Sequence, residues 1–106
     1  MSTDTPFMPR RGANQRVTAT TTSQLITIGG GSKSVRVLNA GAVVAYFVTY
    51  KASDETIVCT NAQSAVGPAG SASSELIIEK PQDHDTLAYL ADSTTTVMNF
   101  QPGEGG

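Results

Sequence analysis

The sequence predicts an all-β protein, an antiparallel β-sandwich of about eight short strands with a jelly-roll-like arrangement. Stretches rich in Val, Ile, Thr and Tyr alternate with Gly, Pro, Ser, Asp and Asn at intervals of roughly 8–12 residues, a spacing typical of sandwiches and barrels. No stretch has convincing helical periodicity, and without crossover helices the strands must pair mostly antiparallel. A chain of 106 residues has room for one such domain.

Four strands are expected in the first half of the chain. The strongest covers residues 43–50 (VVAYFVTY), which are β-branched or aromatic almost throughout. This strand is apolar on both faces, with Tyr46, Val48 and Tyr50 on one side, so we expect it to be central in a sheet. The other three strands either alternate apolar and polar residues or are short apolar stretches, and they cover residues 16–22, 24–28 and 34–38.

Four more strands are expected in the second half. Turn-forming residues precede or follow each of them, for example Pro81, Gln82 and Asp83. A long loop containing a Pro-Ala-Gly sequence is expected at residues 61–74. The strands are predicted at residues 56–60, 75–80, 86–91 and 94–100.

These strands define a β-sandwich domain at residues 16–100, between two segments of different composition. Residues 1–15 contain two prolines and a glycine and no periodicity, which predicts an extended N-terminal arm. Residues 101–106 (QPGEGG) are expected to form a tail without structure of its own. Eight strands in two sheets is the strand count of a jelly roll. An immunoglobulin-like sandwich fits nearly as well, although the Cys…Trp…Cys pattern of true immunoglobulin domains is missing.

Charge is distributed unevenly between the arm and the body. Three arginines and one aspartate give the first sixteen residues a net charge of +2, whereas four cationic and eight acidic residues give the remainder −4. A basic arm on a mildly acidic body suits docking onto an acidic protein surface. The candidate partner-binding residues are the two apolar side chains between the prolines and the three arginines, namely Phe7, Met8, Arg10, Arg11 and Arg16.

Three sequence features could carry catalytic chemistry, and each is better explained structurally. The glycine-rich residues 29–34 lack the spacing of a phosphate-binding loop, and a strand rather than a helix follows them. Residues 83–85 (Asp-His-Asp) follow a proline and read as a solvated turn, because adjacent residues of one strand point to opposite faces and no second histidine exists. The single cysteine, Cys59, lies in an apolar stretch that would raise its pKa. We therefore expect no catalytic site, no metal and no cofactor.

Nucleic acid and membranes are not expected as partners. The aromatic residues Tyr46, Phe47, Tyr50 and Tyr89 could stack on bases, but that mode also needs a basic groove, and the predicted strands contain few cations. No stretch approaches the roughly 20 apolar residues of a membrane helix. The N-terminus lacks the charged and apolar regions of a signal peptide, which predicts synthesis in a cytoplasm.

Three segments carry a resemblance to a known class of protein. They are residues 35–41 (VRVLNAG) before an aromatic strand, residues 68–71 (PAGS) leading into residues 75–78 (ELII), and the closing residues 97–106 (VMNFQPGEGG). Over about residues 25–106 the chain resembles small virion proteins of tailed bacteriophages, some of which are capsid decoration (cement) proteins with a jelly-roll fold.

The resemblance implies a non-enzymatic structural protein of the virion. Its partner would be the major capsid protein, whose lattice it would bind from the outer surface of the head, and we expect it to be a homo-oligomer, a dimer or trimer. The alternative is a head-fibre or tail module that binds a host receptor or glycan, with exposed loops such as residues 61–74 as the functional element. The resemblance supplies no binding residues, because neither the arm nor residues 51–64 match a known pattern.

Overall fold

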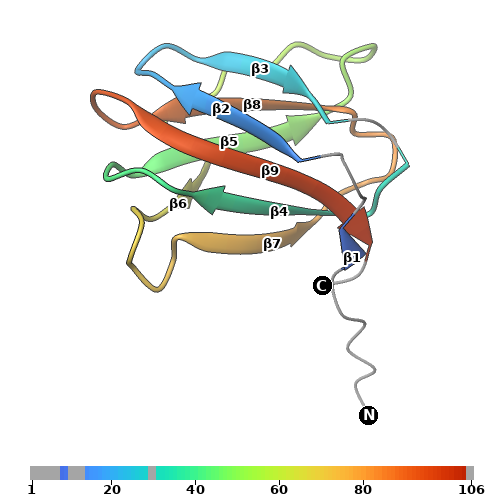
Figure 1. Cartoon of the computed structure of the whole chain (residues 1–106). Coiled ribbons are helices and arrows are strands. Elements are labelled where there is room, and N and C mark those ends of the chain that lie inside the picture. The colour runs from blue at the N-terminus through green and yellow to red at the C-terminus, as the bar shows by residue number, and fades with distance from the viewer. Residues whose placement is uncertain (1–7, 10–13, 29–30, 105–106) are drawn as a thin grey trace.

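The computed structural model describes residues 8–9, 14–28 and 31–104, and within them the chain folds as a sandwich of two antiparallel sheets (Figure 1). The described residues include no helix. The strands are β1 (Met8–Pro9), β2 (Gln15–Ala19), β3 (Gln24–Thr27), β4 (Ser34–Asn39), β5 (Ala45–Tyr50), β6 (Ser64–Val66), β7 (Glu75–Glu79), β8 (Thr86–Ala91) and β9 (Thr96–Glu104).

The order of strands in the two sheets is that of a jelly roll. The first sheet has the order β2-β9-β4-β7, with the short β1 beside β2 on the same edge of β9, and the second sheet has the order β3-β8-β5-β6. The pairs are nested, because β2 pairs with β9, β3 with β8, β4 with β7 and β5 with β6, all antiparallel. Nesting of this kind produces the two Greek keys of a jelly roll, so the predicted fold class is confirmed.

Alternating side chains fill the space between the sheets. The residues that face the core alternate along the strands, as expected for strands with one face on a core. In β4 these are Val35 and Val37, and in β9 they are Met98 and Phe100. The ring of Phe100 packs on Tyr89 of the opposite sheet with ring centroids 5.6 Å apart. This apolar contact joins the two layers of the sandwich.

A second, smaller apolar cluster lies on the outer face of the second sheet. It consists of Tyr50, Cys59 and Ala88, with partly buried residues packed against them. Residues 55–60, here called the covering segment, contribute Cys59 and Ile57 to this cluster. The face of β5 that points away from the sandwich core is therefore apolar as well, which confirms the prediction of a central strand with two apolar faces.

The prediction of a strand at residues 56–60 is wrong. The covering segment has no ladder partner, and the backbone N–H of Cys59 donates to the Ser23 hydroxyl (2.8 Å) rather than to a neighbouring strand. Its alternating apolar residues pack flat on the outer face of the sheet, a pattern that mimics a strand in the sequence. The strand that pairs with β5 at the edge of this sheet is β6, which lies inside the loop predicted at residues 61–74.

The predicted boundaries at residues 15 and 101 also differ from the structure. Gln15 already belongs to β2, and within the predicted arm Met8 and Pro9 pair with Glu104 and Gly103. The predicted tail continues β9 as far as Glu104 and pairs with β4. Pro102 lies between residues 96–100 of β9, which pair with β2, and residues 103–104, which pair with β1. Proline has no N–H to donate, and it is tolerated in a strand where an edge is left unpaired.

A buried asparagine closes the corner where β4 ends. The Asn39 side chain is fully buried; it donates to the Val43 carbonyl (2.6 Å) and accepts from the Thr96 hydroxyl (2.6 Å) and the Gly41 N–H (3.0 Å). A Cβ atom on Gly41 would overlap Thr96 Oγ1 and lie 2.8 Å from Thr96 Cα. Residues 39–41 thus hold the β4–β5 connection against the start of β9.

Candidate functional site

Two of the predicted partner-binding residues lie among the described residues, both along β9. Met8 of β1 pairs with Glu104 of β9. Arg16 of β2 is exposed and pairs with Asn99 of β9. The neighbour of Arg16, Val17, packs against the core, so the Arg16 side chain is directed to the outer face of the first sheet. Phe7, Arg10 and Arg11 lie outside the described residues.

The Asp83–Asp85 segment is a turn, as predicted, and each of its side chains has a structural partner. The carboxylate of Asp83 lies 3.8 Å from Lys51 Nζ, and His84 Nδ1 lies 3.0 Å from the Thr49 hydroxyl. The carboxylate of Asp85 accepts the N–H of Ala52 (3.1 Å) and the Thr86 hydroxyl, and these hydrogen bonds lower the pKa of Asp85. Among the described residues, no group of three His, Cys, Asp or Glu side chains could hold a metal ion.

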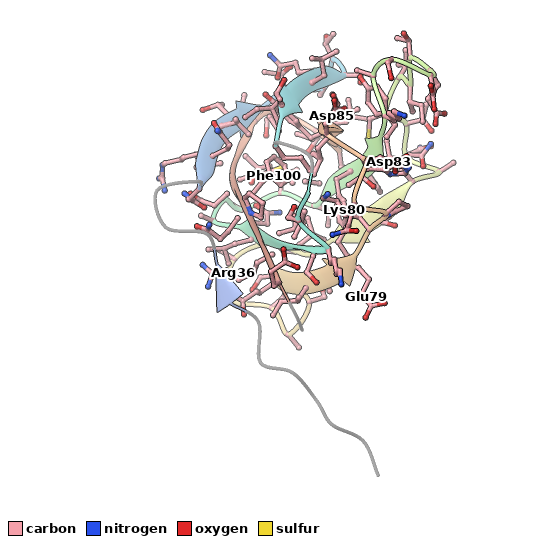
Figure 2. The ribbon with its side chains drawn as sticks, turned by 90° about the vertical axis from the view of Figure 1, so that its right-hand side faces the viewer. Arg36, Glu79, Lys80, Asp83, Asp85 and Phe100 are labelled. Atoms are coloured by element: carbon pink, nitrogen blue, oxygen red, sulfur yellow. The ribbon has the colours of Figure 1, made fainter. Side chains whose placement is uncertain are left out.

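The Lys80 side chain holds this turn against the β3–β4 connection (Figure 2). Its side chain is buried, and Nζ donates to the carbonyl oxygens of Ser32 (2.7 Å) and His84 (2.8 Å). A buried ammonium group is tolerated when backbone carbonyls satisfy its donors. Lys80 therefore joins the β3–β4 connection to the turn before β8.

Cys59 behaves as a buried small apolar residue, as predicted. Its side chain is 2% exposed, and burial raises the pKa of the thiol to about 11. Because the thiolate is the nucleophile, a thiol with this pKa is unreactive at neutral pH. The glycine-rich residues 29–34 are likewise followed by β4 rather than by a helix, and Gly29 and Gly30 themselves lie outside the described residues.

The aromatic residues do not form a platform for bases. Phe47 and Tyr89 point into the sandwich core, and Tyr50 is buried in the outer cluster. Of the four aromatic residues, only Tyr46 is partly exposed; the other three are buried. The described residues also include no helix long and apolar enough to cross a membrane.

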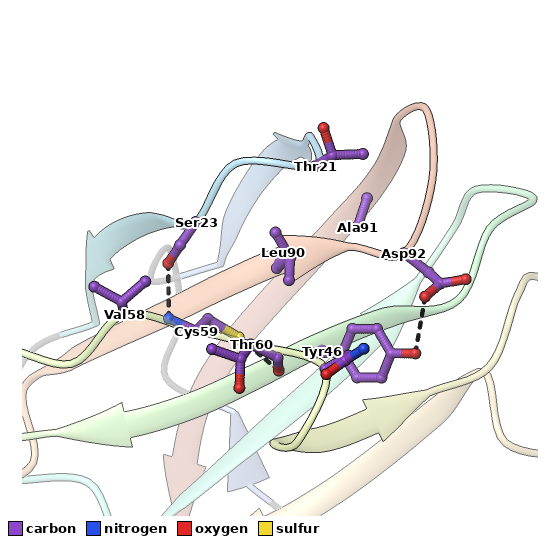
Figure 3. Close-up of a pocket in the computed structure, with 10 residues that line it drawn as sticks. Thr21, Ser23, Tyr46, Val58, Cys59, Thr60, Leu90, Ala91 and Asp92 are labelled. Atoms are coloured by element: carbon purple, nitrogen blue, oxygen red, sulfur yellow. Dashed lines mark hydrogen bonds between the residues drawn. The ribbon is translucent and has the colours of Figure 1, made fainter.

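A pocket that the sequence does not predict lies on the outer face of the second sheet. Its volume is about 370 Å³, and it forms where residues 58–61 cross the ends of β5 and β8. Figure 3 shows Leu90 between Ser23 and the Tyr46–Asp92 pair. The walls also include Val58 and Thr60. Four segments distant in sequence contribute to the pocket, so no local motif could have predicted it.

Hydrogen bonds fix the polar groups of this pocket. The Tyr46 hydroxyl donates to Asp92 Oδ1 (3.0 Å), and this bond raises the pKa of Tyr46. The Ser23 hydroxyl accepts the N–H of Cys59, and the Thr60 hydroxyl accepts the N–H of Ala62 (3.3 Å). The pocket therefore has acceptor groups at Tyr46 and Asp92, and hydroxyl protons available for donation at Ser23 and Thr60.

A second hollow lies on the other side of Val58 and is more apolar. Its walls include Leu25, Ile57 and Val58, and its volume is about 350 Å³. Leu25 and Val58 are 59% and 67% exposed, so this face presents apolar side chains to its surroundings. The outer face of the first sheet is mixed in the described residues: Arg36, which pairs with Glu75 (3.4 Å), lies opposite Ile77, which is 44% exposed.

No family model, curated protein or solved structure matches the chain in comparisons with known proteins. The jelly roll is therefore established by strand order and pairing within the molecule.

Proposed function

We propose that this chain is a decoration (cement) protein of a tailed-bacteriophage head, which binds the outer surface of the major capsid protein lattice. The observation that carries the proposal is the way the N-terminal segment joins the sandwich. Met8 and Pro9 pair with the last two residues of β9, at the end of the sandwich opposite the β8–β9 turn. The chain therefore joins the jelly roll at this end through Met8 and Pro9, the sequence neighbours of Phe7 and Arg10.

A rigid body with a basic, apolar segment at one end suits attachment to an acidic surface. Arg16 adds a positive charge on the same edge of the first sheet as β1, because both β1 and β2 pair with β9. The body itself carries a net charge of −4 from residue 17 onward, so electrostatic attraction would orient the N-terminal end toward the acidic partner. The resemblance to small phage virion proteins and the jelly-roll fold support the same assignment.

Binding would stabilise the head by mass action, because the protein binds the closed lattice and not its precursor. Repeated sites around a symmetry axis favour a homo-oligomer, a dimer or trimer, and several weak attachments then act together. The proposed role is non-enzymatic and places the protein on the virion. The protonated Cys59 thiol and the hydrogen-bonded His84 support the non-enzymatic part of the proposal.

The test is co-sedimentation of the full-length protein with purified heads assembled from the major capsid protein. The double variant Arg10→Ala/Arg11→Ala should lose most of its occupancy, and a second variant that lacks residues 1–13 should lose it entirely. The deletion leaves β2 intact, so a circular dichroism melt should still show a folded domain. A control, Lys33→Ala, removes an exposed cation from the body and should bind normally.

Two results would contradict the proposal. Unchanged occupancy of both arm variants would remove the arm from the mechanism. Failure of the full-length protein to bind heads at any concentration would refute the decoration function itself.

A further inference from the structure

We propose that the pocket between Tyr46, Thr60, Leu90 and Asp92 binds a neutral saccharide. This site does not depend on capsid attachment. Its volume of about 370 Å³ falls within the range of roughly 300–1,000 Å³ that is typical of small-molecule sites. Its walls combine apolar surface with a few fixed polar groups, as such sites do.

The charge of the pocket limits the class of ligand. Asp92 is the ionisable side chain in the lining that is charged at neutral pH, and no Lys, Arg or His belongs to the lining among the described residues. An anionic ligand such as a phosphate would meet a carboxylate with no cation to compensate it. A neutral ligand avoids this repulsion.

The hydrogen-bonding groups of the pocket favour a ligand that both donates and accepts. The Tyr46 proton is already used by Asp92 Oδ1, which leaves the phenol oxygen and the second carboxylate oxygen as acceptors. The hydroxyls of Ser23 and Thr60 each accept a backbone N–H, and among the described residues neither hydroxyl proton has an acceptor. Each hydroxyl group of a sugar can donate and accept, so neighbouring sugar hydroxyls can satisfy both sets.

The apolar part of the wall suits the C–H face of a sugar ring. Leu90 and Tyr46 are partly buried in the cluster on the outer face of the second sheet, so their exposed surfaces are held in place by packing. Figure 3 shows the Tyr46 ring between Asp92 and Thr60, where an aromatic face can contact a ligand that is hydrogen-bonded to both. A rigid aromatic residue with a polar tip loses little side-chain entropy when it binds.

The pocket lies at the opposite end of the sandwich from the N-terminal end, through which the protein is proposed to bind the capsid. Asp92 lies at the β8–β9 turn, whereas β1 pairs with the last two residues of β9. Nine residues of β9 separate these ends by roughly 27 Å, at about 3.3 Å per residue. A protein held through its N-terminal end would therefore leave the pocket accessible to a surface glycan.

The experiment uses the isolated full-length protein, so its outcome is independent of capsid binding. An array of neutral and acidic glycans identifies candidate ligands, and a ¹⁵N–¹H NMR titration with each neutral hit measures the affinity. Glucose 6-phosphate and ethanolamine serve as anionic and cationic probes. We expect saturable shifts of the amides at residues 60–62 and 90–92 with a neutral saccharide, and no comparable shifts with either ionic probe.

Matched variants test the assignment of residues. Asp92→Ala and Thr60→Val should each weaken saccharide binding by tenfold or more, whereas Asp83→Ala should leave it unchanged. Asp83 is a suitable control because it is an exposed carboxylate in the turn that precedes β8, as Asp92 is in the turn that follows it. Thermal melts verify that each variant is folded. The proposal is overturned if no neutral glycan binds, if ethanolamine binds in place of saccharides, or if both pocket variants bind normally.

Discussion

Replacement of Asn39 by alanine should destabilise the protein more than replacement of any exposed asparagine. The fully buried Asn39 side chain accepts from Gly41 N–H and Thr96 Oγ1 and donates to the Val43 carbonyl, in each case over 2.6–3.0 Å. The alanine variant would leave the buried Thr96 hydroxyl and the partly buried Gly41 N–H and Val43 carbonyl without their partner. An unsatisfied buried polar group costs about 1–3 kcal/mol.

Three groups lose their partner in this variant, but partial hydration of the corner lowers the summed cost. We therefore expect the free energy of unfolding to fall by about 3 kcal/mol. For a domain of this size, each kcal/mol lowers the melting temperature by about 4–8 °C, and the expected shift is therefore about 12–24 °C. Urea denaturation followed by circular dichroism measures the free energy, and calorimetry measures the melting temperature.

The matched control is Asn14→Ala. Asn14 is exposed, and its amide donates to Asn99 Oδ1 (3.2 Å) at the surface. Its loss should cost no more than about 0.5 kcal/mol, because surface substitutions have small effects. If the Asn39 and Asn14 variants differ by less than 1 kcal/mol, the Asn39 hydrogen bonds do not hold the corner together and the reasoning is refuted.

Three further predictions concern packing and titration. Gly41→Ala should lower the melting temperature by several degrees, because the added Cβ overlaps Thr96 Oγ1; an unchanged melting curve would contradict the close approach. Phe100→Ala should cost about 3–5 kcal/mol in urea denaturation, since it removes a fully buried ring packed on Tyr89, and a loss below 1 kcal/mol would refute its place in the core. The pKa of Cys59 is raised from its ordinary 9.0 to about 11, so the folded state retains a proton that the unfolded state releases. Stability should therefore be unaffected by this group below pH 9, and the loss of stability as the pH rises toward 11 should be about 2 kcal/mol smaller in a Cys59→Ala variant.

The sequence predicted the fold best where alternation and burial agree. Residues 43–50, which are rich in β-branched and aromatic residues, contain β5, and the apolar residues 86–91 form β8. These are the two central strands of the second sheet and are apolar on both faces. The covering segment misled the prediction, since residues 56–60 (TIVCT) are short, apolar and rich in β-branched residues, as a strand would be, although only Ile57 and Cys59 pack on the sheet and Val58 is exposed. β6 has three residues, two of them exposed, and carries too little pattern to be recognised.

The candidate sites were less predictable than the fold. The saccharide pocket combines residues from the β2–β3 connection, β5, the covering segment and the end of β8, which only the tertiary structure brings together. Asp92 looked like an ordinary turn residue in the sequence, and its bond to Tyr46 depends on the register between β5 and β8. The arm residues Phe7, Arg10 and Arg11 remain predictions, because they lie outside the described residues.

The nested pairing of strands has a consequence for synthesis of the chain. β9 lies between β2 and β4, so β2 has no neighbouring strand, and β4 has only β7, until residues 96–104 have been made. The β5–β6 pair can form early, because only residues 51–63 lie between its two strands. The β2–β9 pair must instead close a loop that contains residues 20–95, which costs more chain entropy. A nascent chain that stalls before residue 96 would leave β2 unpaired and one edge of β4 exposed, a state prone to aggregation. The first sheet thus cannot be completed before residues 96–104 are made.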